Sequence, residues 1–296
     1  MSTMRAGAEK TAPEMPFDSP WRRAWRSARR SPTTMIGTTI VLLFLLVAIL
    51  GPTLAPFSPT ETALANRLMP PSAEHWFGTD SLGRDLFSRI LHGAKLSFIT
   101  GMTVVLTAGV LGTMLGTIAG YFGGKIDEAV MRITDMFLAF PGLILAMAVA
   151  AILRPNLTNT LIAISVTWWP IYARLVRGQV LSIRTLDYVQ AGLALGQSST
   201  RLIWRHILPN ALSPVLVRAT LDMGGVILTA AGLSFIGFGA QPPTPEWGLM
   251  VADGRTFLMT HWWVSTVPAI AILLLVLGFN LMGDGLRDVL DPRLRR

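Results

Sequence analysis

Residues 188–196 of this chain read YVQAGLALG, and Leu208 and Pro209 close the same connection between two apolar segments. Small and nearly uncharged side chains dominate the stretch. A helix made of them presents a smooth face against which a second protein can pack closely. No acid, base or nucleophile stands there in a catalytic pattern, so the stretch indicates a docking surface rather than a site of chemistry.

The composition places the chain in a membrane. Of its 296 residues 51% are hydrophobic and 14% are charged, whereas a soluble domain carries about 25% charged residues. The sequence has no cysteine and only four widely spaced histidines, so disulfides, thiol catalysis and a metal site are not expected. The net charge of +8 comes from Lys and Arg between the apolar segments. Membrane topology explains it, and nucleic acid binding is not expected.

Six apolar segments predict transmembrane helices, because a helix needs about 20 apolar residues to cross a bilayer. Only Arg154 and a few polar residues separate the third segment from the fourth, which suits a tight hairpin. The predicted fold is an all-α membrane protein with six spans. These lie near residues 33–55, 96–120, 136–153, 157–175, 212–238 and 264–283.

The distribution of basic residues predicts the orientation. With the N-terminus inside and six crossings, most Lys and Arg residues fall on the inner side, as expected for cytoplasmic loops. Residues 1–31 combine a disordered tail with the basic stretch 21–30, in which Trp21 and Trp25 share a helix face. We expect this stretch to lie on the anionic inner leaflet and residues 32–296 to form the membrane domain.

Charged residues away from the span ends are confined to Arg218 and Asp222 in the fifth predicted span. They are four residues apart, so they can pair on one helix face. Two interpretations stay open: a local pair near the inner interface, or a pair that lines an aqueous pathway. Ion-coupled carriers place more ionisable residues inside the membrane, so a proton relay is not expected.

The usual sequence motifs for ATP binding and for hydrolase activity are also absent from the sequence. The nearest match to a phosphate-binding loop is Gly124-Lys125, but Ala119 and Ile126 occupy positions that require Gly and Ser or Thr. No HExxH or GxSxG pattern occurs. We therefore expect no catalytic residues and no ATP bound by this chain in that manner.

The connection between the fourth and fifth predicted spans is expected to form two short helices. Asp187 can cap the first helix, and Gly196 permits a sharp turn after it. A second helix runs from Ser199 to about Leu208, and Pro209 is expected to end it.

Residues 187–209 resemble the coupling motif of bacterial ABC importer permeases, which reads Glu-Ala-Ala, three residues, Gly, nine residues and Ile-x-Leu-Pro. Gln190, Gly192 and His206 replace Glu, Ala and Ile of that motif. A Glu at position 190 could form a charge-assisted bond with a partner, whereas Gln offers a weaker neutral one. The spacing is kept by Gln190-Ala191-Gly192, Gly196 and His206-Ile207-Leu208-Pro209.

Four further stretches resemble the C-type subunit of dipeptide, oligopeptide and nickel permeases. With the motif they cover the chain from about residue 30 to its end. They are residues 75–85 (HWFGTDSLGRD), 233–239 (LSFIGFG), 242–248 (PPTPEWG) and 283–293 (GDGLRDVLDPR).

The resemblance implies a type I ABC importer permease fold and a set of partners in the bacterial cytoplasmic membrane. A B-type permease subunit would complete the pathway. Two ATP-binding subunits with ATP and magnesium would drive it, and an extracytoplasmic substrate-binding protein would deliver the cargo. This chain would bind no cofactor. The residues expected to couple it to the ATPases are Gln190, Ala191, Gly192, Leu195, Gly196, Leu208 and Pro209.

The resemblance favours di- or oligopeptides as the cargo, with nickel complexes, glutathione and glycosides as alternatives. A self-sufficient channel or secondary carrier is the alternative from another class, and a membrane-embedded enzyme is a third. The connections 56–95 and 239–262 are long and are expected outside. The second of them either caps the mouth of a pathway or only connects two spans.

Overall fold

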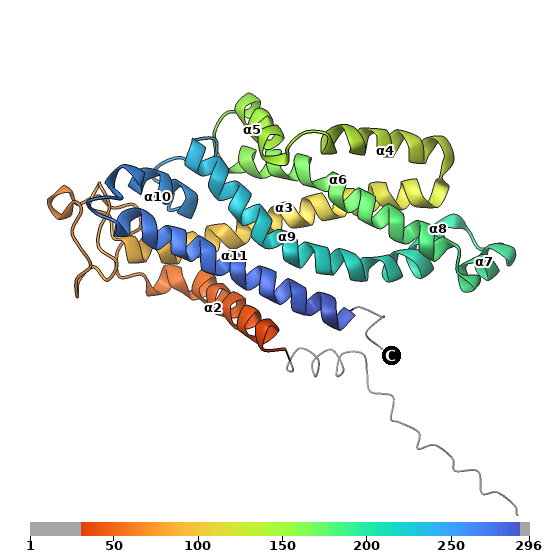
Figure 1. Ribbon diagram of the computed structural model, residues 1–296, viewed down its shortest axis with the longest axis horizontal. Helices are drawn as coiled ribbons and strands as arrows, with labels where there is room; N and C mark the ends of the chain where they lie inside the picture. The colour runs from red at the N-terminus through yellow and green to blue at the C-terminus, as the bar shows by residue number, and fades with distance from the viewer. Residues whose placement is uncertain (1–30, 291–296) are drawn as a thin grey trace, which may run out of the picture.

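Backbone polar groups in an apolar chain have to bond within their own segment, which favours helices over open strands. The computed structural model describes residues 31–290, with side chains to residue 288. Its regular elements are helical apart from one bridge between Thr79 and Asp85 (Figure 1). The predicted all-α class is confirmed. The predictions for the tail and for the basic stretch within residues 1–30 lie outside the described residues.

Within residues 31–290, four helices are by themselves long and apolar enough to cross a membrane. They are α2 (Pro32–Leu54), α3 (Leu86–Phe122), α9 (Leu208–Ile236) with the turns that precede it from Ser199, and α11 (Trp263–Leu290). The remaining elements are η1 (Leu64–Asn66), α4 (Gly124–Leu138), α5 (Gly142–Leu153), α6 (Leu157–Arg184), α7 (Asp187–Ala194), α8 (Ser199–Leu202), the π turn η2 (Ile203–Ile207), α10 (Trp247–Gly254) and η3 (Arg255–Phe257).

The third predicted span is wrong as a single helix. α4 ends at Leu138, inside the predicted range, and α5 follows at an angle of 91°. Pro141 stands at the break, where it offers no N–H group and disfavours a helical conformation of the residue before it. The two helices together pass the length and composition test for one further span.

Two other predicted spans are shorter than the helices that contain them. α3 begins at Leu86 rather than at residue 96, because the Asp85 carboxylate accepts a bond from the Ser88 N–H at 2.7 Å and caps the helix. α6 continues past residue 175 to Arg184. Its second half forms ion pairs with α4, in which Arg177 bonds Asp127 at 2.5 Å and Arg174 bonds Asp135.

Glycines set the close contact between α3 and α6. A Cβ atom on Gly112 would lie 2.5 Å from the Trp169 carbonyl oxygen and from the Tyr172 Cβ. One on Gly116 would overlap the Ala173 carbonyl oxygen. Only a hydrogen atom fits at these positions, so the two backbones touch, as small residues allow between membrane helices.

A second glycine contact brings the start of α2 beside the end of α11. A Cβ on Gly37 would lie 2.6 Å from Leu281 and Met282, and one on Gly285 would overlap Thr34. The two described ends of the chain therefore lie on the same side of the molecule (Figure 1).

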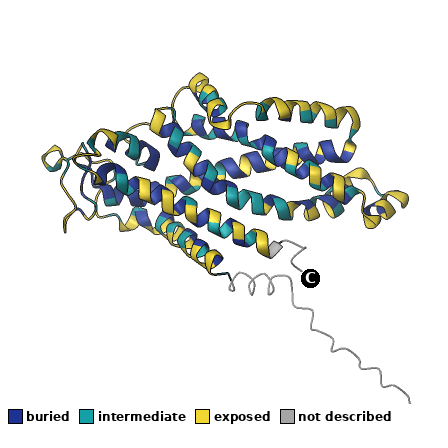
Figure 2. Ribbon diagram, in the orientation of Figure 1, coloured by how far each residue is buried: buried dark blue, intermediate teal, exposed yellow. Residues whose placement is uncertain are grey.

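Buried apolar residues form two cores. One joins α2, the first half of α3, the second half of α9, α10 and α11. The other joins the second half of α3 with α6, α7, α8 and the start of α9. Exposed residues follow the outward faces of the helices (Figure 2), and on α2 these include Leu42, Leu43, Leu46 and Ile49. Such a continuous apolar face suits contact with lipid.

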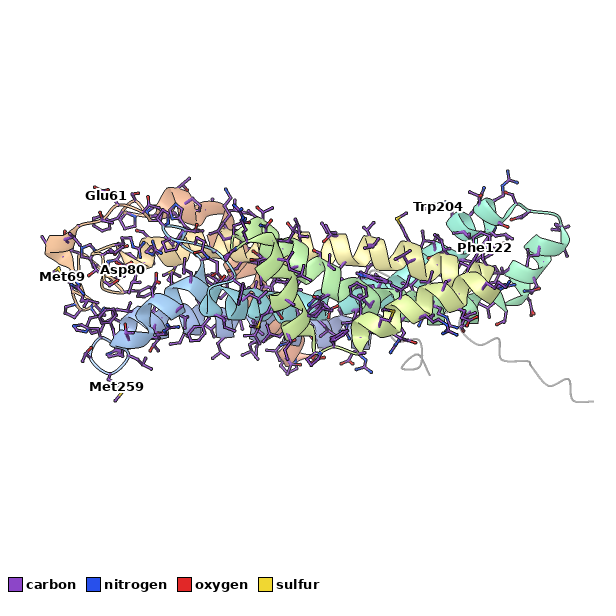
Figure 3. The ribbon with its side chains drawn as sticks, turned by 90° about the horizontal axis from the view of Figure 1, so that it is seen from above. Glu61, Met69, Asp80, Phe122, Trp204 and Met259 are labelled. Atoms are coloured by element: carbon purple, nitrogen blue, oxygen red, sulfur yellow. The ribbon has the colours of Figure 1, made fainter. Side chains whose placement is uncertain are left out.

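The two ends of the elongated molecule differ in character (Figure 3). Loops that contain Glu61, Met69, Asp80 and Met259 form one end, and Phe122 and Trp204 lie toward the other. We call residues 56–89 and 239–262 the outer cap, after the side on which these connections are expected from the sequence. Residues 187–209 lie at the opposite end, and we call them the coupling segment because they resemble the coupling motif.

We predict that Gly112→Ala lowers the free energy of unfolding by about 1–3 kcal/mol, because the added methyl group overpacks the α3–α6 contact. Thermal unfolding in detergent measures the change. Gly178→Ala on α6 is the matched control, since a Cβ there meets no atom within 4 Å and alanine favours the helix. Equal thermal unfolding midpoints for the two variants would show that the close α3–α6 contact does not contribute to stability.

Candidate functional site

The coupling segment projects from one end of the molecule (Figure 1). α7 follows α6 after a two-residue connection, and α8 leads the chain back toward α9. Gly196 turns the chain between them with a φ of 75°, a conformation that glycine adopts without strain. The predicted sharp turn at Gly196 is confirmed.

Apolar side chains anchor this segment to the membrane helices. Val189 of α7, Leu202 of α8 and Ile207 of the π turn are all 0% exposed. They belong to the same core as Val180 and Ile183 of α6. The coupling segment is therefore packed on α6 and continues into α9.

The residues predicted for coupling divide between two faces of α7. Gly192 faces inward, where a Cβ would lie 2.8 Å from the Leu202 Cδ2 atom. Gln190 and Ala191 are exposed, and Leu195 is 81% exposed. The outward face of α7 therefore has the small side chain of Ala191 at its centre, and the large apolar side chain of Leu195 stands at its end.

The predicted cap at Asp187 is wrong. Leu186 takes the extended conformation that precedes the helix, with φ of −73° and ψ of 144°, and no side chain caps α7. The reason is the short connection from α6, which leaves Leu186 as the extended residue and Asp187 already in the first turn.

The predicted helix end at Pro209 is also wrong. α8, η2 and α9 form one helix from Ser199 to Ile236. The Leu208 N–H bonds to the carbonyl of Ile203, five residues back, which makes the turn a π turn. The wider turn gives the ring of Pro209 room beside the carbonyl four residues before it, where an α turn would clash. Leu208 is half-buried and Pro209 is exposed.

Arg218 and Asp222 pair on one face of α9, as predicted. The Arg218 Nε donates to the Asp222 carboxylate at 3.0 Å. The Asp222 side chain is 4% exposed, whereas that of Arg218 is 41% exposed. A buried carboxylate thus pairs with the guanidinium of a side chain that is partly exposed at the surface of the chain.

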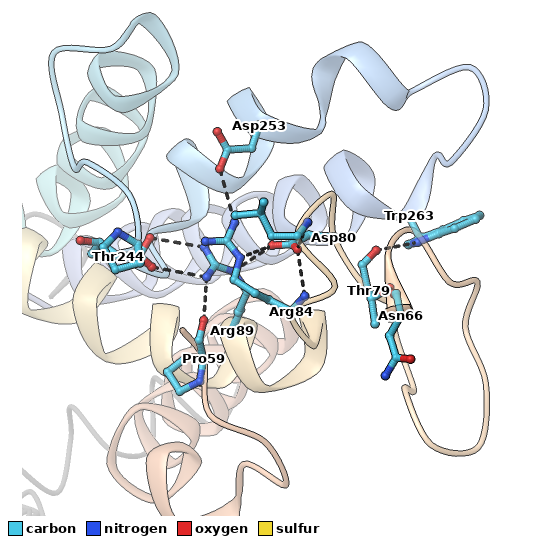
Figure 4. A network of polar contacts seen from close by, with 11 residues as sticks. Pro59, Asn66, Thr79, Asp80, Arg84, Arg89, Thr244, Asp253 and Trp263 are labelled. Carbon is cyan, nitrogen blue, oxygen red and sulfur yellow. Dashed lines mark hydrogen bonds and ion pairs between the residues drawn. The ribbon is translucent and has the colours of Figure 1, made fainter. Parts of the chain in front are cut away.

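The outer cap contains a dense network of buried charges (Figure 4). The Asp80 carboxylate accepts bonds from the Arg84 N–H at 3.0 Å and the Arg84 Nε at 2.5 Å. The Arg89 Nε lies 3.8 Å from the same carboxylate. All three side chains are at most 5% exposed. Two arginines therefore share one buried acid, and the carboxylate offsets part of the cost of burying them.

Arg89 links two distant loops. Its Nη1 donates to the carbonyl of Pro59 at 2.7 Å and to that of Pro243 at 3.4 Å, and its Nη2 donates to that of Thr244 at 3.5 Å (Figure 4). The fork of a guanidinium suits such multiple contacts. The start of α3 therefore holds both halves of the outer cap together.

Two acids fix α10, and one of them, Asp253, joins it to the charge network. Asp253 lies 3.8 Å from the Arg84 Nη2, and burial raises its pKa while Arg84 and Arg89 act in the opposite direction. The Glu246 carboxylate caps α10 by accepting from the Gly248 and Leu249 N–H groups at 2.9 and 2.8 Å. Burial raises the pKa of Glu246 against the effect of these bonds.

Residues 112–296 match the family described as binding-protein-dependent transport system inner membrane component. Residues 19–71 match the N-terminal transmembrane domain of oligopeptide transport permease C. The chain belongs to this family of ABC importer permeases.

Relatives of this permease carry names from peptide transport. A dipeptide transport system permease protein of Alkalihalophilus pseudofirmus is 49% identical over 277 residues, 94% of this chain and 91% of that protein. A probable D,D-dipeptide transport system permease protein of Escherichia coli is 50% identical over 262 residues, 88% of each chain. A glutathione transport system permease protein of Pectobacterium atrosepticum is 42% identical over 278 residues, 94% and 92% of the two chains.

The fold of this permease is also that of a solved transporter. A chain of the inward-facing MetNI methionine ABC transporter superposes with a TM-score of 0.56 at 19% identity, covering 68% of this chain and 96% of that one. The predicted type I importer permease fold is thereby confirmed. The permease subunit is non-catalytic, and within residues 31–290 no cluster of His, Asp or Glu could hold a metal ion.

Sequence reasoning missed the charge network of the outer cap, although residues 75–85 carried the family resemblance. Asp80, Arg84 and Arg89 stand close together at the start of a long apolar segment. Charges in that position usually face water, so their sequence alone predicts an exposed loop. Contacts with segments far away in the sequence bury them: Pro59 and residues 243–244 cover Arg89, and Met250, Asp253 and Val264 lie against the group.

We predict that Asp80→Ala lowers the free energy of unfolding of this permease by about 3–5 kcal/mol, because it leaves two buried guanidinium groups without their shared acid. Denaturant or thermal unfolding in detergent measures the effect. Glu61→Ala, an exposed acid in the same cap, should change the value by less than about 0.5 kcal/mol. Similar losses for both variants would argue against the network.

Proposed function

We propose that this permease forms one half of the translocation pathway of an ATP-driven peptide importer and that the coupling segment connects it to an ATPase. One observation carries the proposal. A segment with the spacing of the coupling motif projects from the membrane helices, exposes Ala191 and Leu195, and is anchored by fully buried residues. Identities of 49% and 50% to dipeptide permeases support the cargo class.

The proposed topology has six crossings with both termini in the bacterial cytoplasm. α2, α3, the bent pair α4 and α5, α6, α9 and α11 would be the six crossing segments. The excess of Lys and Arg on the side of the coupling segment supports the orientation. In this arrangement residues 32–296 are the membrane domain, and residues 1–31 lie on the cytoplasmic side.

The proposed partners follow from the family. A B-type permease would enclose the pathway together with this chain. Two ATP-binding subunits would hold ATP and magnesium and hydrolyse the ATP, one of them on the coupling segment. A substrate-binding protein would dock on the outer cap, whose buried charges make a stiff platform.

The proposed mechanism is a transmitted displacement. Closure of the ATPase pair on ATP moves α7, and α7 moves α6 and α9 because Val189, Leu202 and Ile207 are packed into their common core. The pathway then changes from inward- to outward-facing. Hydrolysis and release reset it. ATP hydrolysis on the partner subunit supplies the free energy, so this chain needs no ATP-binding site of its own.

Co-purification followed by reconstitution tests the assignment. Tagged chain is purified from native membranes, the accompanying subunits are identified by mass spectrometry, and the complex is placed in liposomes. We expect a second permease and P-loop ATPases, and dipeptide uptake that requires ATP and a binding protein. Uptake by this chain alone, without ATP, would overturn the proposal in favour of a self-sufficient carrier. Uptake of glutathione but not of dipeptides would show that the cargo is glutathione rather than a dipeptide.

We predict that Ala191→Arg abolishes ATP-dependent uptake while the chain is still inserted, because a long charged side chain blocks the small docking face. Uptake and retention of the ATPase in the reconstituted complex are the measurements. Ala65→Arg makes the same change at an exposed position at the other end of the molecule. Normal coupling in Ala191→Arg would show that residues 187–209 do not dock.

Arg218 and Asp222 are further proposed to line the pathway rather than only to stabilise α9. The support is the half-exposed guanidinium in a chain with few charges in its spans, because intramembrane charges mark pathways. A peptide offers a terminal carboxylate to which such a guanidinium can bond.

We predict that Asp222→Asn alone reduces stability and that the double variant Arg218→Gln/Asp222→Asn recovers it, because no unpaired charge remains. If the pair lines the pathway, the recovered variant still transports dipeptides with a higher KM. Thermal unfolding and uptake kinetics distinguish the cases. If the double variant has normal stability and an unchanged KM for dipeptides, the pair only stabilises α9 and does not line the pathway.

A further inference from the structure

The side chain of Gln190 is engaged within its own chain. Its Nε2 donates to the carbonyl oxygen of Arg184 at 2.8 Å. Arg184 is the last residue of α6, and the carbonyl groups of a last helical turn have no partner within the helix. The amide of Gln190 therefore fastens α7 to the end of α6.

A glutamate could not make this contact. An ionised carboxylate only accepts hydrogen bonds, so it cannot bond to a carbonyl oxygen. It would also place a negative charge at the negative end of the α6 dipole. Gln190, which replaces the Glu of the motif, thus has a role within its own chain. As a consequence, position 190 offers no carboxylate to a partner protein.

Asp187 is an acidic residue on the exposed side of α7 that also carries Ala191 and leads to Leu195. It is exposed and precedes Ala191 by one helical turn, and Leu195 follows one turn later. Residues four apart lie on one helix face. None of the ion pairs between described side chains involves Asp187. A carboxylate, a small centre and an 81% exposed leucine thus line one outward stripe.

We propose that Asp187 supplies the acidic contact of this permease with its ATPase and that Gln190 is a positioning residue for α7. The inference rests on the proposed coupling of residues 187–209 to that subunit. The complementary surface on the ATPase would have a basic side chain at the rim of an apolar pocket that receives Leu195. The competing role for Asp187 is purely local, since an acid in the first turn also stabilises a helix.

Salt dependence of binding tests the contact. The permease pair is placed in nanodiscs, and the affinity for the purified ATPase subunit is measured between low and high NaCl. We expect Asp187→Asn to weaken binding about fivefold at low salt, the upper end for an exposed ion pair, and to flatten the salt dependence, because a rim charge acts through screened electrostatics. Gln190→Glu is expected not to tighten binding.

Asp284→Asn is the matched control, since Asp284 is an exposed acid at the inner end of α11. It should bind as the unaltered chain does. Hydrogen exchange of residues 187–194 in the permease without ATPase separates the local role from the contact. We expect unchanged protection in Asp187→Asn.

Three results would overturn the inference. One is an Asp187→Asn variant whose affinity and salt dependence equal those of Asp284→Asn. Another is faster exchange of α7 in Asp187→Asn, which would make the effect structural. The third is tighter binding of Gln190→Glu, which would return the acidic contact to position 190. If the unaltered permease retains no ATPase, the proposed function itself fails, and that outcome is distinct from these three.

Discussion

The backbone contact between α3 and α6 is the constraint on which the rest of the molecule depends. Gly112 and Gly116 allow these helices to touch, and each helix leads into one end of the molecule. α3 begins in the outer cap with Asp85 and Arg89, and α6 runs directly into α7. A separation of the two helices would therefore disturb both ends at once. In a bilayer such close packing replaces the hydrophobic driving force that water provides.

Charge is distributed in a way that follows from the surrounding medium. The spans contain few ionised groups, whereas the outer cap buries Asp80, Arg84 and Arg89 together. Burying two arginines with one shared acid is unfavourable unless further N–H groups find acceptors, and the carbonyl groups of Pro59, Pro243 and Thr244 supply acceptors for the Nη groups of Arg89. The result fixes loops that are far apart in sequence, which a loop with exposed charges could not do.

Much of this fold could be predicted from the sequence because apolar length and glycine position are local signals. The helical class and the turn at Gly196 follow from them. The break before Pro141 was hidden by the apolar residues on both sides of it. The continuous helix through Pro209 depends on a π turn held by packing, and the partner of Gln190 depends on where α6 ends. The cap network joins residues more than 150 positions apart, as in the bond from Arg89 to Pro243, and no local pattern contains it.

The π turn at Ile203–Ile207 also fixes an angle. A π turn adds one residue to a helical turn, and one residue corresponds to a rotation of about 100° around the helix axis. α8, which precedes the turn in the same helix, is therefore rotated by that amount relative to the position that an uninterrupted α9 would give it. The azimuth at which α8 leaves the bundle thus depends on this one wide turn, while the helix from Ser199 to Ile236 stays continuous.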